Sequence, residues 1–160
     1  MAGTGGGKQS VTVATFMIRE PERLKASDTV ASAVEKLMSG GYMALPVVDA
    51  EERLAGMFSM FSVFRLVLPR VAMLDNVMPD LSFVHDTVDD LRQRFKDLKD
   101  QPVGAYCQPL GPVVHPETDI TQALLLLYRS HGNLPVVDAR THRLVGVVSH
   151  RDAMTLVAKA

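Results

Sequence analysis

The second half of the chain shows a regular succession of apolar patterns. Between residues 120 and 130 apolar side chains recur every three or four positions, which predicts a helix that begins after Thr118 or Asp119. Residues 134–137 and 144–148 are continuous apolar runs rich in valine and predict two buried strands joined by a turn. With an extended piece over 112–114 and a last helix over 151–159, the order is strand, helix, strand, strand, helix.

The same pattern occurs earlier in the chain. Leu45–Ala50 recurs unchanged as Leu134–Ala139, 89 residues later, and Arg53–Ser59 aligns with Arg143–Ser149 at a shift of 90. The chain is therefore two copies of one unit, and the first copy has its own helix, capped by Asp28 or Ser27. The predicted organisation is a mobile tail (1–10), repeat 1 (11–70), an inter-repeat connection (71–101) and repeat 2 (102–160).

The connection between the copies contains a further predicted helix within 85–101. Val88, Leu91, Phe95 and Leu98 share one face of it, and Asp90 and Arg94 are spaced for an ion pair. We expect a cap at Asp86 or Thr87. The apolar stripe must be covered either by the repeats or by another subunit.

Polar and charged side chains that could bind a ligand follow the last strand of copy two. Gly146–Asp152 places a serine hydroxyl and, three residues later, a carboxylate on the first turn of a helix. A carboxylate accepts two hydrogen bonds from a ribose diol, and a helix N-terminus favours a nearby anion. His150 and Arg151 add cationic groups that could reach phosphate. The alternative is that Ser149 and Asp152 only cap the helix.

The two copies, each with Leu-Pro-Val-Val-Asp on the strand and Gly-x-x-Ser before the last helix, closely resemble a tandem pair of CBS domains (a Bateman module). The resemblance implies an α+β fold of two βαββα repeats packed about a pseudo-twofold axis, here with an extra inter-repeat helix. It also implies two clefts for adenosine-type ligands and a homodimer. The ligand residues expected in the second cleft are Val113, Arg129, Asn133, Leu134, Pro135, Ser149, His150, Arg151 and Asp152.

Copy one departs from this motif. Gly56–Ser62 keeps the first serine but has Ser62 at the carboxylate position, and Met60 and Phe61 replace the two basic residues. We expect this cleft to fail as a standard nucleotide site. The helix that follows is apolar nearly all round, which is typical of core or a subunit interface.

Composition narrows the classes of function. The 160 residues carry a net charge of −1, so no basic excess is available for non-specific nucleic-acid binding. The single cysteine, Cys107, and five scattered histidines do not indicate a zinc site, and Cys107 is expected to be a small buried apolar residue. Residues 57–74 contain two arginines and a proline and are not expected to span a membrane. A cytoplasmic location is expected.

The sequence therefore predicts a non-enzymatic regulatory module that binds AMP, ADP or ATP in the second cleft, requires no cofactor and acts on an unidentified partner. Three alternatives stay open: a structural dimerisation module with no ligand, a sensor of an S-adenosylmethionine-type ligand, and a small enzyme. No nucleophile and base support the enzyme, since Ser149, His150 and Asp152 are neighbours on one turn.

Overall fold

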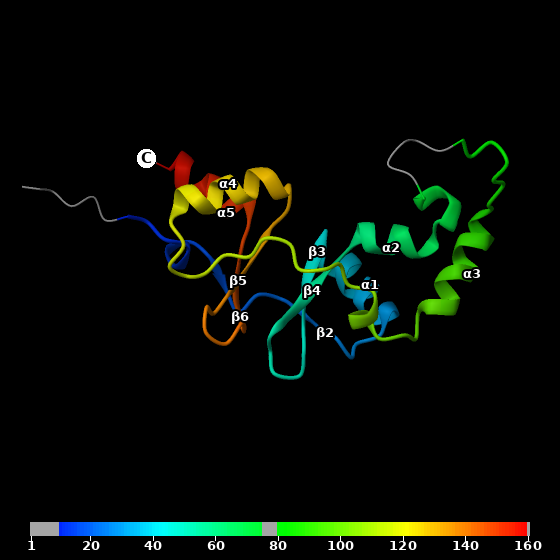
Figure 1. The fold of residues 1–160 in the computed structure, drawn as a ribbon, viewed down its shortest axis with the longest axis horizontal. Coiled ribbons are helices and arrows are strands. Elements are labelled where there is room, and N and C mark those ends of the chain that lie inside the picture. The colour runs from blue at the N-terminus through cyan, green and yellow to red at the C-terminus, as the bar shows by residue number, and fades with distance from the viewer. Residues whose placement is uncertain (1–9, 75–79, 160) are drawn as a thin grey trace, which may run out of the picture. The chain divides into compact units, whose positions relative to one another are not determined.

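The computed structural model describes residues 10–74 and 80–159 (Figure 1). Its α-helices are α1 (Val30–Gly40), α2 (Met60–Val67), α3 (Val88–Leu98), α4 (Ile120–Ser130) and α5 (His150–Ala158). Its strands are β1 (Ile18–Arg19), β2 (Leu24–Lys25), β3 (Ala44–Val48), β4 (Leu54–Ser59), β5 (Leu134–Val137) and β6 (Leu144–Val148). Short 3₁₀ turns are η1 (Val13–Thr15), η2 (Arg70–Met73) and η3 (Val103–Ala105). The predicted α+β class is confirmed, and the predicted order of elements holds except that the piece over 112–114 forms only an isolated bridge, at Val114.

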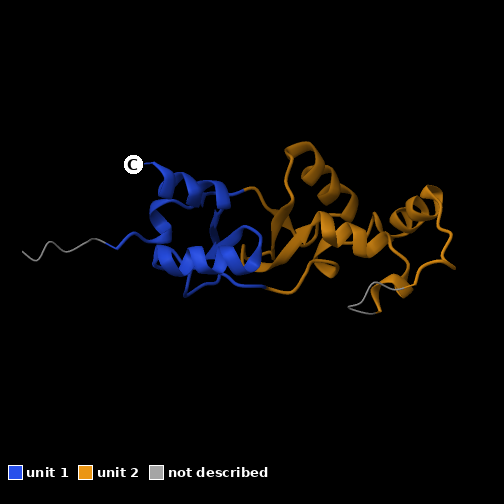
Figure 2. Ribbon diagram, turned by 90° about the horizontal axis from the view of Figure 1, so that it is seen from above, with its two compact units in different colours: residues 1–21, 111–160 blue, residues 22–110 orange. Residues whose placement is uncertain are grey.

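The chain forms two compact units, which Figure 2 shows in different colours. Unit 1 contains the described parts of residues 1–21 and 111–160, and unit 2 contains those of residues 22–110. Each unit has a three-stranded sheet, in the order β1-β6-β5 in unit 1 and β2-β3-β4 in unit 2. The units therefore do not coincide with the sequence repeats, because residues 11–21 of the first repeat fold with the second.

The sheet of unit 2 is built on the hairpin of β3 and β4. These strands are antiparallel, with Leu45 opposite Phe58, and β2 pairs in parallel with β3. The continuous apolar run over 45–48 is buried, as a strand covered on both faces requires. The core of this unit consists of Leu24, Val30, Ala33, Leu37, Leu45, Val47, Phe58 and Val103.

Helix α1 begins one residue later than the sequence suggested. Its N-cap is Thr29, whose side-chain oxygen accepts a hydrogen bond from the Ser32 backbone N–H at 3.1 Å. Asp28, one of the two expected caps, accepts instead from the Lys25 N–H at 2.9 Å and closes the preceding turn. Both residues suit an N-cap, so the register of the turn decides between them.

The sheet of unit 1 repeats this arrangement. Leu134 lies opposite Val148 in the antiparallel pair β5–β6, and Val114 forms a parallel bridge with Val136. The tight turn between these strands is held by Asp138, whose carboxylate accepts from the backbone N–H groups of Thr141 and Arg140, both at 2.9 Å. These hydrogen bonds lower the pKa of Asp138. Turn chemistry therefore accounts for this residue. The core consists of Val13, Met17, Val114, Ala123, Leu127, Leu134, Val136, Val148 and Ala153.

Each unit receives one strand segment from the other repeat. In unit 1, β1 pairs antiparallel with β6, with Ile18 opposite Val147. In unit 2, the equivalent residue Gln108 forms an antiparallel bridge with Met57 on β4. The opening segment of each repeat thus completes the sheet of the other repeat.

The glycines of the two Gly-x-x-Ser motifs lie where these segments cross. A Cβ atom on Gly56 would be 2.5 Å from the Gln108 carbonyl oxygen and 2.8 Å from the Cys107 sulfur. A Cβ atom on Gly146 would be 2.9 Å from the Ile18 carbonyl oxygen. A side chain at either position would push the incoming segment away, so both glycines are required by close backbone approach.

The predicted inter-repeat helix is α3, which packs against α2 in unit 2. Thr87 is its N-cap, and Thr87 and Asp90 form a reciprocal capping box. Asp90 is used in the cap and makes no close ion pair with Arg94 in the described structure, although the two charges still attract each other. Arg94 instead makes two hydrogen bonds to Asp86, at 2.7 and 2.8 Å, and donates to the Val67 carbonyl of α2 at 3.0 Å.

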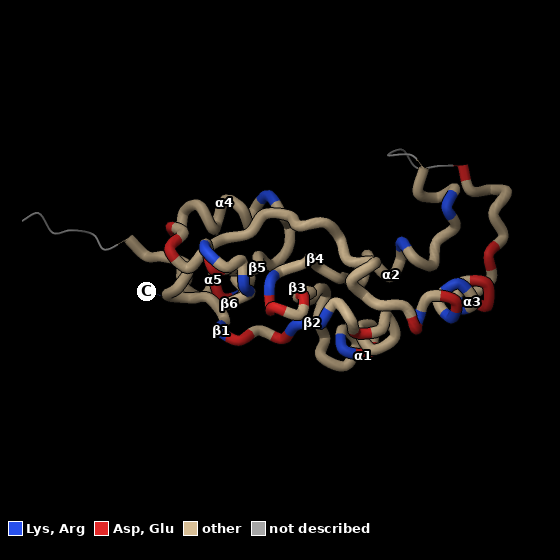
Figure 3. The backbone as a smooth tube through the Cα atoms, turned by 60° about the horizontal axis from the view of Figure 1, so that its bottom comes forward, with Lys and Arg blue, Asp and Glu red and all other residues tan. Residues whose placement is uncertain are grey.

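The surface of α3 carries interspersed acidic and basic residues, as Figure 3 shows. Of its apolar stripe, Phe95 packs against the core of unit 2, and Leu91 and Leu98 are half-buried. Val88 remains 61% exposed. The stripe is therefore covered mainly within unit 2.

Candidate functional site

The predicted pair of Ser149 and Asp152 meets at the start of α5. Ser149 leaves β6 in an extended conformation and is the N-cap, and its side-chain oxygen accepts from the Asp152 N–H at 3.0 Å. The Ser149 hydroxyl donates to Oδ2 of Asp152 at 2.5 Å. The other carboxylate oxygen, Oδ1, has no hydrogen-bond partner among the described residues. The site therefore offers one free carboxylate oxygen and one that a ligand hydroxyl could take over.

The capping in this site is one-sided. Ser149 caps the helix, but the Asp152 carboxylate does not accept from the Ser149 backbone N–H, so no reciprocal box forms within the described chain. Thr87 and Asp90 show that an aspartate at this position can close such a box. The Asp152 carboxylate is therefore not used to cap the helix.

The basic residues near this site differ in their surroundings. Nε2 of His150 lies 3.3 Å from the Leu127 carbonyl oxygen on α4, so its ring is turned toward that helix. Arg151 is exposed and has no hydrogen bond or ion pair with the described residues. Arg129 lies in the last turn of α4 and is also exposed. The guanidinium groups of both arginines are therefore available to an anion.

The expected adenine-binding residues lie on neighbouring extended segments. Pro135 is on β5, and its carbonyl accepts from the Val114 N–H at 3.1 Å, so half-buried Val113 belongs to the segment that runs next to β5. Leu134 is only 1% exposed and belongs to the core, so its backbone rather than its side chain is available. Asn133 is exposed immediately before β5.

The matching region of unit 2 uses its residues differently. The side-chain oxygen of Ser59 accepts from the Ser62 N–H at 3.2 Å, and that of Ser62 accepts from the Ser59 N–H at 3.1 Å. Both serines are buried, at 8% and 2% exposure. Here the capping box is complete, and no carboxylate is present at the position of Asp152.

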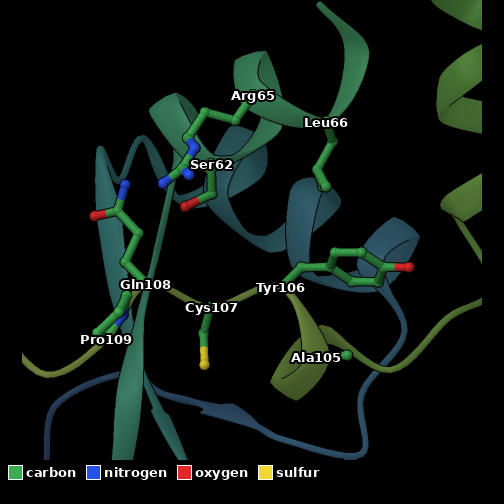
Figure 4. A pocket seen from close by; sticks show the side chains of 8 residues that line it. All are labelled: Ser62, Arg65, Leu66, Ala105, Tyr106, Cys107, Gln108 and Pro109. Atoms are coloured by element: carbon green, nitrogen blue, oxygen red, sulfur yellow. The ribbon is translucent and has the colours of Figure 1, made fainter. Parts of the chain in front are cut away.

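A cavity of about 330 Å³ lies beside this capping box, and Figure 4 shows the side chains around it. Its lining residues come from α2 and from residues 105–109, which begin at the end of η3. They are Ser62, Arg65, Leu66, Ala105, Tyr106, Cys107, Gln108 and Pro109. Sequence reasoning did not identify Arg65 or Gln108. The spacing of Ser62 and Arg65 on one helix face was the available signal for Arg65, but none pointed to Gln108.

Cys107 behaves as an apolar residue, as the sequence predicts, although it is only half-buried. It packs against the core of unit 2, and its thiol donates to the Gly104 carbonyl at 3.3 Å. Burial raises the pKa of the Cys107 thiol. A raised pKa reduces the thiolate fraction near neutral pH, which disfavours a nucleophilic role.

Residues 10–74 and 80–159 lack two further classes of site. This part of the chain contains no helix with the length and apolar character needed to cross a bilayer. It also contains no group of three or more histidine, cysteine, aspartate or glutamate residues arranged to hold a metal ion.

Curated relatives of the chain are plant proteins. It is 30% identical over 129 residues to the CBS domain-containing protein CBSX2, chloroplastic, and 27% identical over 143 residues to CBSX1, chloroplastic, both of Arabidopsis thaliana. These alignments cover 79% and 86% of the chain but only 54% and 60% of the relatives. The expected cytoplasmic location stays a prediction, since the names of both relatives place them in chloroplasts.

Solved structures agree with the fold. The crystal structure of CBSX2 from Arabidopsis thaliana superposes with a TM-score of 0.71 at 24% identity and covers 93% of this chain and 95% of its own. A crystal structure of CBSX2 in complex with AMP gives a TM-score of 0.68, with coverage of 92% and 96%.

The profile of the CBS domain family matches two segments of the chain, residues 13–69 and 96–159. These segments contain both Leu-Pro-Val-Val-Asp strands and both Gly-x-x-Ser motifs. Because the matches cover most of the chain and agree with the fold, this protein belongs to the CBS domain family and is a CBS pair.

Proposed function

We propose that this protein is a non-enzymatic regulatory module that binds an adenine nucleotide at the Ser149–Asp152 site of unit 1. The observation that carries the proposal is the one-sided cap. The Asp152 carboxylate keeps one oxygen without a partner in the described chain, whereas the equivalent Ser62 is used in a complete capping box.

Each part of a nucleotide has candidate partners in unit 1. Asp152 and Ser149 would bind the ribose diol, because a carboxylate accepts two hydroxyl hydrogen bonds and charged hydrogen bonds are the stronger ones. The N-terminus of α5, Arg151 and Arg129 would attract the phosphates. His150 would contribute less, since its ring faces the Leu127 carbonyl.

The comparison with CBSX2 supports the ligand class. CBSX2 has been crystallised with AMP and has the fold of this chain. An S-adenosylmethionine-type ligand would use the same diol contact but would not need the arginines. The dependence of binding on the arginines, which would contact the phosphate charge, therefore distinguishes a nucleotide from an S-adenosylmethionine-type ligand.

Exposed apolar side chains favour a homodimer as part of this function. Phe61 and Phe64 of α2 are 61% and 55% exposed, and their rings make an edge-to-face contact with centroids 6.3 Å apart. Met154 and Val157 of α5 are 61% and 60% exposed. Large apolar side chains grouped on a surface mark interaction sites. Sedimentation at micromolar concentration should give a dimer, and a monomer would contradict this assignment.

A purely structural dimerisation module is the second candidate, because the same exposed residues would serve it without a ligand. An enzyme finds less support. Nε2 of His150 faces the Leu127 carbonyl rather than the Ser149 hydroxyl, so the serine lacks the adjacent imidazole base of a serine–histidine pair.

The replacement Asp152→Asn tests the nucleotide site. Asparagine retains the size of the residue and an oxygen that can accept from the Ser149 hydroxyl, but it removes the charge, so nucleotide affinity should fall by about 1.5–3 kcal/mol. Thermal stability without ligand should change little. Calorimetry with AMP on both proteins measures the difference, and equal affinities would leave the structural module as the better assignment.

Arg151→Ala gives the complementary result. It should weaken ATP and ADP more than adenosine, because the guanidinium would contact phosphate and not ribose. The same loss for all three ligands would contradict the role given to Arg151.

A further inference from the structure

The exposed side chain of Arg65 lines the cavity beside α2 in unit 2 and supplies a positive charge there. In Figure 4 the Arg65 side chain extends toward Ser62 and Gln108 at the edge of the cavity. Arg65 has no ion pair or hydrogen bond with the described residues, and none of the eight residues that line the cavity is acidic. A guanidinium stays charged at any relevant pH, so this cavity favours an anion.

Two neutral donors lie next to this guanidinium. The Ser62 oxygen accepts from the Ser59 N–H and lies 3.3 Å from the Ser59 hydroxyl oxygen, a contact in which either hydroxyl can donate. When Ser59 is the donor, the Ser62 hydroxyl hydrogen can turn toward a ligand. The Gln108 backbone is tied to Met57 by a hydrogen bond of 2.8 Å, so its side chain is anchored at the cavity edge. That side chain has no hydrogen bond with the described residues. A guanidinium, an amide and a hydroxyl can together surround an oxyanion.

The remaining walls are apolar. Leu66 extends from α2 toward Tyr106, and Pro109 borders the side with Gln108 (Figure 4). The volume of about 330 Å³ is near the lower end of the range for ligand sites. The cavity therefore suits a small molecule with an apolar body and one charged end.

We propose that this cavity binds a small organic anion, with Arg65 as the charge partner of its oxyanion group and Ser62 and Gln108 as hydrogen-bond donors. The site differs in chemistry from the Ser149–Asp152 site. It has no carboxylate to accept a diol, so it selects its ligand by charge and not by a sugar. It is independent of the nucleotide site proposed for unit 1.

Three simple probes test the proposal. Benzoate and phenyl phosphate carry the two common oxyanions on the same apolar ring, and benzamide is the neutral counterpart of benzoate. Titration of the full chain, followed by amide NMR, should give saturable shifts at Ser62 and at 106–108 with either anion. Benzamide should bind at least about ten-fold more weakly. The ratio of the affinities for benzoate and phenyl phosphate shows whether the site prefers a carboxylate or a phosphate group.

Matched arginine variants locate the effect. Arg65→Gln should reduce anion affinity by about ten-fold or more. Arg70→Gln removes the same charge from η2, which is outside the cavity lining, and should change anion affinity by less than about two-fold. Equal losses in the two variants would show general electrostatic attraction and overturn the proposal. Benzamide binding as tightly as benzoate, or no saturation by either anion up to about 10 mM, would also overturn it.

Separate readouts distinguish this site from the nucleotide site. Asp152→Asn should leave benzoate and phenyl phosphate affinity unchanged, and Arg65→Gln should leave AMP affinity unchanged. Loss of AMP binding in Asp152→Asn with intact anion binding would support both proposals. Anion binding that disappears with Asp152→Asn would place the anion in unit 1 and contradict this one.

Discussion

The starts of α2 and α5 have the same backbone and different side-chain chemistry. In both, a serine leaves the last strand of a hairpin and caps a helix with its side-chain oxygen. In unit 2 the third residue, Ser62, returns the hydrogen bond and is buried. In unit 1 the third residue, Asp152, does not accept a hydrogen bond from the Ser149 backbone N–H. It is half-buried, and one of its carboxylate oxygens has no hydrogen-bond partner in the described chain. One residue therefore separates a helix end used for stability from one available to a ligand.

The largest effect is expected where both helix starts depend on a glycine. Gly56→Ala should destabilise the protein by about 2–3 kcal/mol, because the new Cβ would be 2.5 Å from a backbone oxygen that cannot rotate away. Gly146→Ala should cost about 1 kcal/mol, since its nearest atom is 2.9 Å away and the next is a flexible methionine sulfur. Denaturant unfolding measures both.

Gly111→Ala is the control, because nothing lies within 4 Å of its added Cβ. An equal cost for all three replacements would show that glycine flexibility, rather than the crossing segments, explains the effect.

Transplanting the unit 1 chemistry into unit 2 should create a second nucleotide site. The double variant Ser62→Asp, Arg65→Thr reproduces Asp152 and Thr155 at the equivalent positions. The new carboxylate should improve adenosine affinity in unit 2 by about ten-fold, the value of one charged hydrogen bond. Calorimetry should then give two adenosines per chain where the parent binds one. A stoichiometry that stays at one would show that the serine is not what disables repeat 1.

The equivalent helices α1 and α4 should respond differently to loss of their caps. Thr29→Ala should cost about 1 kcal/mol, because it removes the hydrogen bond to the Ser32 N–H. Asp119→Ala should cost little, since the Asp119 side chain makes no cap hydrogen bond in the described structure. The free energy of unfolding of each variant provides the comparison, and similar losses would contradict it.

The smallest effect is expected at α3, which has no counterpart among the described residues of unit 1. The hydrogen bonds from Arg94 lower the pKa of Asp86 below its usual 3.8. The ionised carboxylate therefore supports the folded state above that value, and this support is lost as the pH falls through the lowered pKa. Hydrogen exchange of α3 amides should accelerate over that acid range in the parent chain. In Asp86→Asn the exchange should already be faster at neutral pH and should lack this step.

Local sequence was sufficient to predict most elements and the contact between Ser149 and Asp152. Apolar spacing located the helices and hairpins because each element buries a face with its own period. The Gly146–Asp152 motif brought Ser149 and Asp152 together correctly because both lie on one helical turn. The predicted N-cap of α1 was wrong, and the main partner of Arg94 is Asp86 rather than Asp90, because several nearby residues could each have made those contacts.

Tertiary structure alone decided which segments share a unit. The repeat was visible in the sequence. The local sequence does not show that Ile18 pairs with β6 or that Gln108 pairs with β4, because strand pairing depends on contacts between residues far apart in the chain. The same long-range pairing puts Gln108 beside Arg65 and forms the cavity of unit 2. The sequence by itself determined the two repeats and the difference between Ser62 and Asp152. The fold decided what surrounds each of them, because a cavity is made by side chains that only folding brings together.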